Sequence, residues 1–148
     1  MTEPGIVTVL CVSAVIEDHR RLENIFSHSN WRLSRAENGS EAVSRLIEEP
    51  TPVIISDSEL PDRSWLSLLD VSSTLSTPPP RMIVASRLAD DLLWQQVLQH
   101  GGYNVLQKPF DAREVFWVVR HAWLDWRSEW ERVAGHPRGA ERAMAAGV

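Results

Sequence analysis

The feature that most constrains the fold is the regular alternation of short apolar runs with longer segments of helical periodicity. Five short runs are predicted as strands, at residues 6–12, 31–36, 52–56, 82–85 and 103–106; most are apolar, and the run at 31–36 is half-polar. A helix is predicted after each: from Glu17 to about Asn30, between the turn 38–40 and residues 48–50, from Trp65 to about Leu75, from about Asp90 to the glycines 101–102, and from about Ala112 to near Val133. Strands and helices that alternate through short loops form a parallel sheet between helical layers. The sequence therefore predicts an α/β fold with a doubly wound, five-stranded parallel sheet.

In such a sheet, side chains at the carboxyl ends of the strands converge on one edge. The residues predicted to meet there are Ser13 and Ala14 after the first strand, Asp57 after the third, Ala85 and Ser86 at the end of the fourth, and Lys108 after the fifth. An acid, a hydroxyl and a lysine suit chemistry on a phosphoryl group, because a carboxylate can accept it while an ammonium and a hydroxyl stabilise its oxygens.

Charge and cysteine content disfavour several classes of protein. The chain of 148 residues has 15 Lys and Arg against 20 Asp and Glu, and the resulting net charge of −5 disfavours binding to nucleic acid or to an anionic membrane. Cys11 lies in the first apolar run, which predicts a buried thiol in a reducing compartment. That run is too short to span a membrane and is followed by charged residues rather than a cleavage site, so a cytoplasmic protein is expected.

Two motifs at the predicted strand ends resemble those of a known family. The segment 57–61, Asp-Ser-Glu-Leu-Pro, resembles the Asp-x-x-Met/Leu-Pro loop of response-regulator receiver domains. The segment 101–110, Gly-Gly-Tyr-Asn-Val-Leu-Gln-Lys-Pro-Phe, resembles their Gly-Ala-x-x-Tyr-Leu-x-Lys-Pro-Phe segment. The resemblance extends over roughly residues 6–133, and it implies a flavodoxin-like (βα)5 fold and a role in two-component signalling.

The resemblance also implies roles for individual residues. Asp57 would be the phospho-acceptor, Lys108 would contact the acyl phosphate, and Lys108–Pro109 is a candidate cis peptide. The spacing back from Lys108 places the family's site hydroxyl at Ser86, whereas the pattern at the strand end places Ala85 there; Ser86 is preferred. The implied upstream partner is a sensor histidine kinase or a phosphotransfer protein.

The sequence departs from the family at the metal site. Receiver domains normally carry two adjacent acids after the first strand to hold Mg²⁺, and the alignment of the first helix places Ser13 and Ala14 at those positions. Mg²⁺ is usually held by one or two carboxylates, so its affinity is expected to be weakened, with Asp57 as the remaining ligand. Val105 likewise stands where the family usually has an aromatic switch residue.

Three other acids are candidates to replace the missing pair. Glu17 and Asp18 lie in the first turn of the first helix, within reach of the metal site. The preferred interpretation is simpler, namely that these two acids complement the helix dipole. Glu59 would add charge near the pocket, although a solvated side chain is the commoner role for such a residue.

The last predicted helix holds four of the seven tryptophans: Trp117, Trp123, Trp126 and Trp130. Its apolar arc is wider than one face of a sheet requires. Tryptophan is enriched at interface hot spots, so these side chains are candidates for a surface that binds a protein partner or a second copy of the chain. The alternative is that they cover the helix's own fold.

Residues 1–134 are predicted to form the receiver-like domain and residues 135–148 a flexible C-terminal tail too short for a DNA-binding unit. The favoured function is a single-domain, atypical response regulator of a phosphorelay, with no enzymatic activity and with output through protein contacts. The alternative is a phosphorylation-independent pseudo-receiver that acts as an adaptor or dimerisation module. A flavodoxin-like enzyme or nucleotide binder is disfavoured because no Gly-rich loop follows the first strand.

Overall fold

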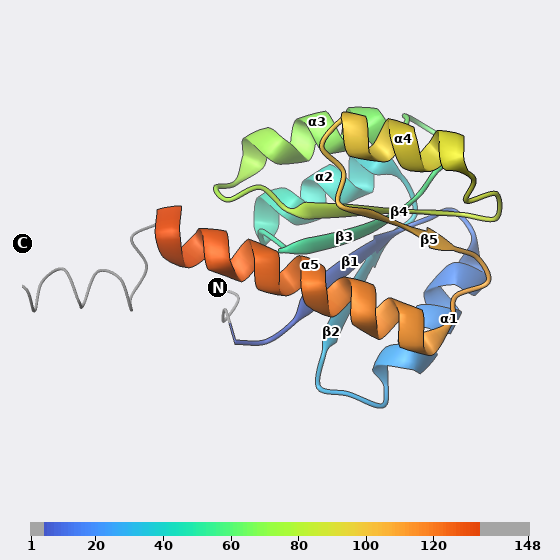
Figure 1. Cartoon of the computed structure of the whole chain (residues 1–148), viewed down its shortest axis with the longest axis horizontal. Coiled ribbons are helices and arrows are strands. Elements are labelled where there is room, and N and C mark those ends of the chain that lie inside the picture. Colours follow the sequence, from blue (N-terminus) through green and yellow to red (C-terminus); the bar gives the residue numbers. More distant parts are fainter. Residues whose placement is uncertain (1–4, 134–148) are drawn as a thin grey trace, which may run out of the picture.

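The computed structural model describes residues 5–133, which form one five-stranded parallel sheet with helices on both faces (Figure 1). The strands are β1 (Thr8–Val12), β2 (Arg32–Ala36), β3 (Val53–Asp57), β4 (Arg81–Ser86) and β5 (Asn104–Gln107). The helices are α1 (Ile16–Phe26), α2 (Gly39–Glu48), α3 (Trp65–Leu75), α4 (Asp91–Gln99) and α5 (Ala112–Val133). The strand order is β2-β1-β3-β4-β5, and every neighbouring pair is parallel. The predicted fold class is confirmed, while the predicted tail at 135–148 and the domain boundary at 134 lie outside the described residues.

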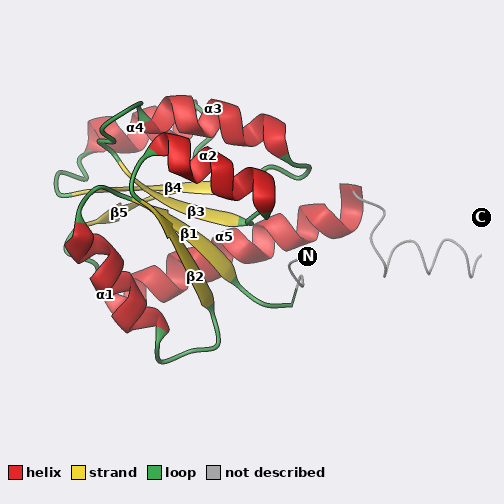
Figure 2. Cartoon of the chain, turned by 180° about the vertical axis from the view of Figure 1, so that it is seen from behind, coloured by secondary structure: helices red, strands yellow, loops and turns green. Residues whose placement is uncertain are grey.

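Two hydrophobic cores lie on opposite faces of the sheet. Helices α1 and α5 cover one face, and α2, α3 and α4 cover the other, as Figure 2 shows. Alternate residues along each strand point to opposite faces, so Cys11 and Ile55 pack on the α1–α5 face while Leu10 and Ile54 pack on the α2–α4 face. Because β1, β3 and β4 are mostly buried on both faces, they are largely apolar and could be recognised as such in the sequence, whereas β2 at the edge of the sheet is partly exposed and half-polar.

Polar side chains and glycine fix the ends of the helices. The side chains of Asn38, Ser64 and Asp90 each accept a hydrogen bond from a backbone N–H in the first turn of α2, α3 and α4. At the end of α4, Gly101 adopts φ 90°, and the N–H of Gly102 donates to the Val97 carbonyl at 2.7 Å. This left-handed turn closes the helix at the glycine pair, as the sequence predicts.

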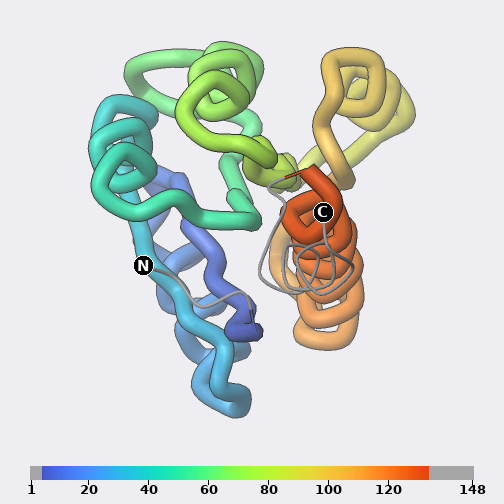
Figure 3. Tube along the Cα trace, turned by 90° about the vertical axis from the view of Figure 1, so that its left-hand side faces the viewer, coloured from blue at the N-terminus to red at the C-terminus, as the bar shows by residue number. Residues whose placement is uncertain are grey.

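Helix α5 extends past the sheet at the end opposite to the carboxyl ends of the strands (Figures 1 and 3). Its 22 residues include the four tryptophans of the predicted partner surface. One of these, Trp123, is 6% exposed and belongs to the core on the α1–α5 face, so its assignment to a partner surface is corrected. Neither α5 nor any other helix within residues 5–133 is long and apolar enough to cross a membrane.

The other three tryptophans are accessible to different degrees. Trp117 is exposed, whereas Trp126 and Trp130 are half-buried and stack with their ring centroids 6.1 Å apart. The stacked pair lines a cavity of about 410 Å³ together with residues of the α2–β3 and α3–β4 connections. Figure 3 shows the end of α5 beside the α3–β4 connection.

The cysteine has the environment expected from the sequence. Cys11 lies in β1 and is 1% exposed. Burial raises the pKa of its thiol, so the reactive thiolate is disfavoured. Cys11 therefore acts as a small core residue.

Candidate functional site

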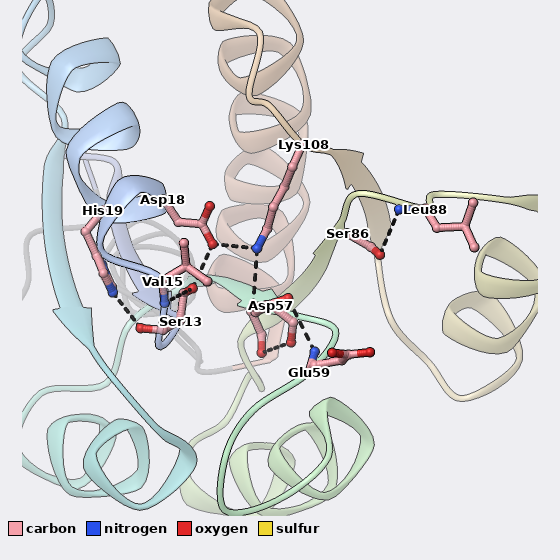
Figure 4. A network of polar contacts seen from close by, with 10 residues as sticks. Ser13, Val15, Asp18, His19, Asp57, Glu59, Ser86, Leu88 and Lys108 are labelled. Atoms are coloured by element: carbon pink, nitrogen blue, oxygen red, sulfur yellow. Dashed lines mark hydrogen bonds and ion pairs between the residues drawn. The ribbon is translucent and has the colours of Figure 1, made fainter.

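Three predicted site residues lie at the carboxyl edge of the sheet, where Asp57 ends β3 and where Ser13 and Lys108 directly follow β1 and β5. Each follows a core residue of the α1–α5 face by two positions and therefore points to that face: Ser13 after Cys11, Asp57 after Ile55, and Lys108 after Leu106. Figure 4 shows Lys108 extending toward Asp57, and its Nζ lies 3.2 Å from Asp57 Oδ2. The predicted pairing of this acid with this lysine is thus present in the structure.

Asp18 also enters the site, from the first turn of α1. Its Oδ2 lies 2.5 Å from Lys108 Nζ and accepts a hydrogen bond from the Ser13 hydroxyl at 2.7 Å (Figure 4). Helix dipole complementation, the preferred interpretation from sequence, does not account for these contacts. Glu17, the preceding residue, has an exposed side chain.

Ser13 holds this corner together. Its hydroxyl accepts a hydrogen bond from the backbone N–H of Val15 at 3.0 Å while donating to Asp18. Its carbonyl lies 2.7 Å from His19 Nε2, which places the ring proton on that nitrogen because a carbonyl only accepts. The Ser13 hydroxyl thus helps to orient the Asp18 carboxylate.

The remaining predicted site residues lie on the other side of Asp57. Asp57 Oδ1 accepts a hydrogen bond from the backbone N–H of Glu59 at 3.3 Å, and the Glu59 side chain extends away from Lys108 (Figure 4). Ala85 is buried and pairs in register with Asp57, whereas the Ser86 hydroxyl accepts from the backbone N–H of Leu88 at 3.2 Å. Ser86 is the last residue of β4, and its hydroxyl is already hydrogen-bonded to the backbone of the following loop.

A cavity of about 380 Å³ lies beside Lys108, and its lining carries both basic and acidic side chains. Arg21 from α1 and Arg87 from the β4–α4 loop line it together with Asp18 and Glu17. The Arg21 Nε donates to the carbonyl of Phe110 at 3.0 Å, which ties α1 to the loop after β5. Arg21 was not singled out in the sequence, because a charged residue in an amphipathic helix gives no local signal of its role.

The peptide bond between Lys108 and Pro109 is cis, as predicted. Val105, at the position where the resembled family usually has an aromatic residue, is buried against the core of the α2–α4 face. β5 therefore has an aliphatic rather than an aromatic side chain at position 105.

Comparison with known proteins shows the family to which the chain belongs. The family model of the response regulator receiver domain matches residues 14–120. The chain belongs to this family. No curated protein matches the sequence significantly.

Solved receiver structures share the fold of this receiver domain. The signal receiver domain of an HD domain-containing protein from Pseudomonas fluorescens superposes with a TM-score of 0.78 at 24% identity, covering 90% of this chain and 98% of that one. The signal receiver domain of a putative LuxO repressor protein from Vibrio parahaemolyticus gives 0.78 at 23% identity, covering 88% and 99%. The chemotaxis response regulator CheY4 of Vibrio cholerae gives 0.71 at 17% identity, covering 79% and 98%. At these identities the likeness shows the fold.

Receiver domains typically bind Mg²⁺ at the phosphorylation site, and in this receiver the Asp18 and Asp57 carboxylates both contact the Lys108 ammonium. Asp18 Oδ2 already faces both the Lys108 ammonium and the Ser13 hydroxyl, and Asp57 Oδ2 faces the same ammonium. Mg²⁺ requires six oxygen ligands close to it in octahedral geometry, and a neighbouring ammonium would repel it. Within residues 5–133, no group of three or more His, Cys, Asp or Glu side chains is placed to hold a metal ion.

Proposed function

We propose that this chain is an atypical, single-domain response regulator receiver in which Asp57 accepts a phosphoryl group from a sensor histidine kinase or a phosphotransfer protein. The observation that carries the proposal is the position of Lys108 Nζ, 3.2 Å from Asp57 Oδ2 at the carboxyl edge of the sheet. An ammonium at this distance offsets the negative charge that a phosphoryl group brings to the carboxylate. Asp57 itself receives the phosphoryl group, so we propose that the protein acts as a switch rather than as an enzyme.

Phosphorylation of Asp57 would alter the charge on which the site is built. By analogy with other phosphorylated side chains, it adds about −1.5 to −2 charge units. In the structure the Lys108 ammonium is shared between the Asp57 and Asp18 carboxylates. A phosphoryl group on Asp57 would attract this ammonium more strongly than the Asp57 carboxylate does. A shift of Lys108 would change the loop after β5, which joins the site to the surface formed by α4, β5 and α5.

This surface is the proposed output face. Between α4, β5 and α5 lies a cavity of about 330 Å³, lined in part by Trp94, Val105 and Trp117. Trp117 is exposed at its rim, and an exposed aromatic beside an apolar hollow is typical of protein-binding surfaces. The net charge of −5 supports a protein partner over nucleic acid. We place this activity in the cytoplasm, where histidine kinases present their phosphoryl groups.

The test is the intact mass of the full chain after incubation with acetyl phosphate. We expect one phosphoryl adduct on the wild type and none on Asp57→Asn. Asp70→Asn, which makes the same change at an exposed residue of α3, serves as the matched control and keeps the adduct. An adduct that persists on Asp57→Asn, or that never forms on the wild type, contradicts the proposed function.

A second candidate function, a phosphorylation-independent adaptor or dimerisation module, is favoured by the stacked pair Trp126 and Trp130 and the cavity that they line. In this case the protein would bind its partner, or a second copy, equally well with or without Asp57. Light scattering of the wild type and of a Trp126→Ala/Trp130→Ala variant distinguishes the cases. A dimer that the double substitution dissociates and that Asp57→Asn leaves intact supports the adaptor.

A further inference from the structure

The contacts of Lys108 define an internal ion triad at the site. Its ammonium lies between two carboxylates, 2.5 Å from Asp18 Oδ2 and 3.2 Å from Asp57 Oδ2. All three side chains are nearly buried, at 9%, 10% and 12% exposure for Lys108, Asp18 and Asp57. Charges this close in a poorly hydrated site interact strongly, so the triad is an electrostatic unit rather than a surface contact.

Burial and hydrogen bonds hold the Asp18 side chain in this position. It is buried in the first turn of α1, and the Ser13 hydroxyl donates to the same oxygen that faces Lys108. Ser13 is in turn fixed by the N–H of Val15 and by His19. Ser13, which the sequence alignment places at the position of a family acid, thus helps to direct the Asp18 carboxylate of α1 toward Lys108.

The triad places the Lys108 ammonium between the two carboxylates of the site, and each carboxylate contacts it through one oxygen. A divalent ion seated between them would have to displace this ammonium or tolerate its repulsion. Since residues 13 and 14 are Ser and Ala, no further carboxylate from the end of β1 is present to favour the divalent ion.

We propose that Lys108, held in place by Asp18, substitutes for the divalent cation at Asp57, so that phosphoryl transfer to Asp57 proceeds without Mg²⁺. Asp18 is then a positioning residue that acts through Lys108. This inference rests on the proposed function for its transfer step, but its electrostatic part, the exclusion of Mg²⁺ by the lysine, stands independently. The two parts are therefore tested separately.

The transfer step balances without a metal or a proton. A carboxylate oxygen of Asp57 attacks the phosphorus of acetyl phosphate, a new O–P bond forms, and the bond from phosphorus to the acetyl oxygen breaks. Acetate leaves with the electron pair of that bond. Donor and product are both acyl phosphates and both leaving and attacking groups are carboxylates, so charge is conserved. Lys108 donates hydrogen bonds to the phosphoryl oxygens as the negative charge moves toward Asp57.

The electrostatic part is tested by Mg²⁺ binding, followed by calorimetry and by the shift of the melting temperature. We expect the wild type to show no response to millimolar Mg²⁺. Lys108→Met removes the ammonium, leaves Asp18 and Asp57 facing each other, and is expected to bind Mg²⁺ more tightly by on the order of tenfold or more, because a close repulsive charge is lost. The double variant Lys108→Met/Asp18→Asn is expected to lose this gain. Wild-type binding as tight as that of Lys108→Met overturns the inference, whatever happens with acetyl phosphate.

The transfer part is tested by the rate of adduct formation, measured with EDTA and with Mg²⁺. We expect equal rates for the wild type in both conditions. Asp18→Asn is expected to slow the reaction by on the order of tenfold, as one charge-assisted contact to the lysine is lost. Asp18→Glu is expected to restore part of the rate, which loss of folding would not allow. Asp91→Asn, the same change in the exposed first turn of α4, is the matched control.

The outcomes separate the two proposals. An adduct that forms only with Mg²⁺ overturns this inference and leaves the proposed function standing. No adduct on the wild type under either condition overturns the proposed function, and the Mg²⁺-binding arm then decides whether Lys108 excludes the ion. A rate with Asp18→Asn equal to that of the wild type removes the positioning role of Asp18. Denaturation midpoints of all variants show whether a lost rate reflects lost folding.

Discussion

Trp117 and Trp123 lie on the same helix, α5, but only Trp123 packs into the core. Trp123 is 6% exposed, and the guanidinium of Arg127 lies 5.3 Å from its ring centroid. Trp117 is 60% exposed and contacts the ring of His121 at a centroid distance of 4.1 Å. The two indoles therefore have different roles, one in folding and one at the surface.

Substitution of these two residues should separate stability from binding. Trp123→Ala removes a large buried side chain and is expected to lower the free energy of unfolding by about 3–5 kcal/mol. Trp117→Ala is expected to change it by no more than about 0.5 kcal/mol, since the side chain is exposed. Urea denaturation measures both. Equal losses for the two variants would contradict the assignment of Trp123 to the core and of Trp117 to the surface.

The fold could be predicted in detail because its signals are local. Strands β1, β3 and β4 are mostly buried on both faces and therefore appear as apolar runs, and helices α2, α3 and α4 begin at polar caps such as Asn38 or Asp90. The glycine pair that ends α4 was recognised for the same reason. The role of Trp123 was not predicted correctly, because helical periodicity shows that a face is apolar but does not show how far the sheet extends beneath it.

The site was predicted only in part. Asp57 and Lys108 follow apolar strands directly, so the sheet geometry alone brings them to one edge. Asp18 belongs to a helix, and its direction depends on how α1 packs and on the hydrogen bond from Ser13, neither of which is encoded in a short motif. An acid in the first turn of a helix is already explained by its favourable interaction with the helix dipole. The sequence therefore offers no reason to expect that Asp18 contacts Lys108, 90 residues away.

Asp62 links the loop after β3 to the start of α2. Its carboxylate accepts hydrogen bonds from the backbone N–H groups of Gly39 and Ser40, each at 2.8 Å, and from the Ser40 hydroxyl at 2.9 Å. These contacts, led by the Gly39 N–H, lower the pKa of Asp62 from 3.8 to about 2. The ionised form is therefore favoured in the folded protein.

The pKa of Asp62 predicts how stability depends on pH. A carboxyl with a lowered folded-state pKa stabilises the fold above its unfolded-state value and loses this contribution as the pH falls through the folded-state value. Asp62→Asn should therefore be less stable than the wild type at neutral pH, and the difference should narrow as the pH falls below about 4. Urea midpoints measured from neutral pH to about pH 3 provide the check. A difference that stays constant over this range would show that the charge of Asp62 does not contribute.

Arg81 connects β4 to α5 through a forked ion pair. Its Nε lies 2.8 Å from Asp125 Oδ2 and its Nη2 lies 2.5 Å from Glu129 Oε1, while the Arg81 side chain itself is only 13% exposed. Both acids are more exposed than the arginine, which reduces the strength of the pairs by screening.

We expect Arg81→Met to lower the free energy of unfolding by about 1 kcal/mol, and Arg81→Lys to lower it by less, because lysine keeps the charge but cannot bind both acids in a fork. The loss should shrink at high salt, where the ion pairs are screened. Arg120→Met, at an exposed position of α5, is the control. A loss that does not depend on salt would assign the effect to packing of the arginine stem rather than to charge.

Gly101 has the positive φ of 90° that ends α4, and other residues rarely adopt this conformation. Open space surrounds the position where a Cβ would lie, so the effect of a substitution comes from the backbone alone. Gly101→Ala is expected to lower the free energy of unfolding by about 1–2 kcal/mol. Gly101→Asn should lower it by less, because asparagine tolerates the left-handed region better than alanine. Thermal or urea denaturation of the two variants beside the wild type tests this order, and an alanine variant as stable as the asparagine variant would show that the turn relaxes to a negative φ.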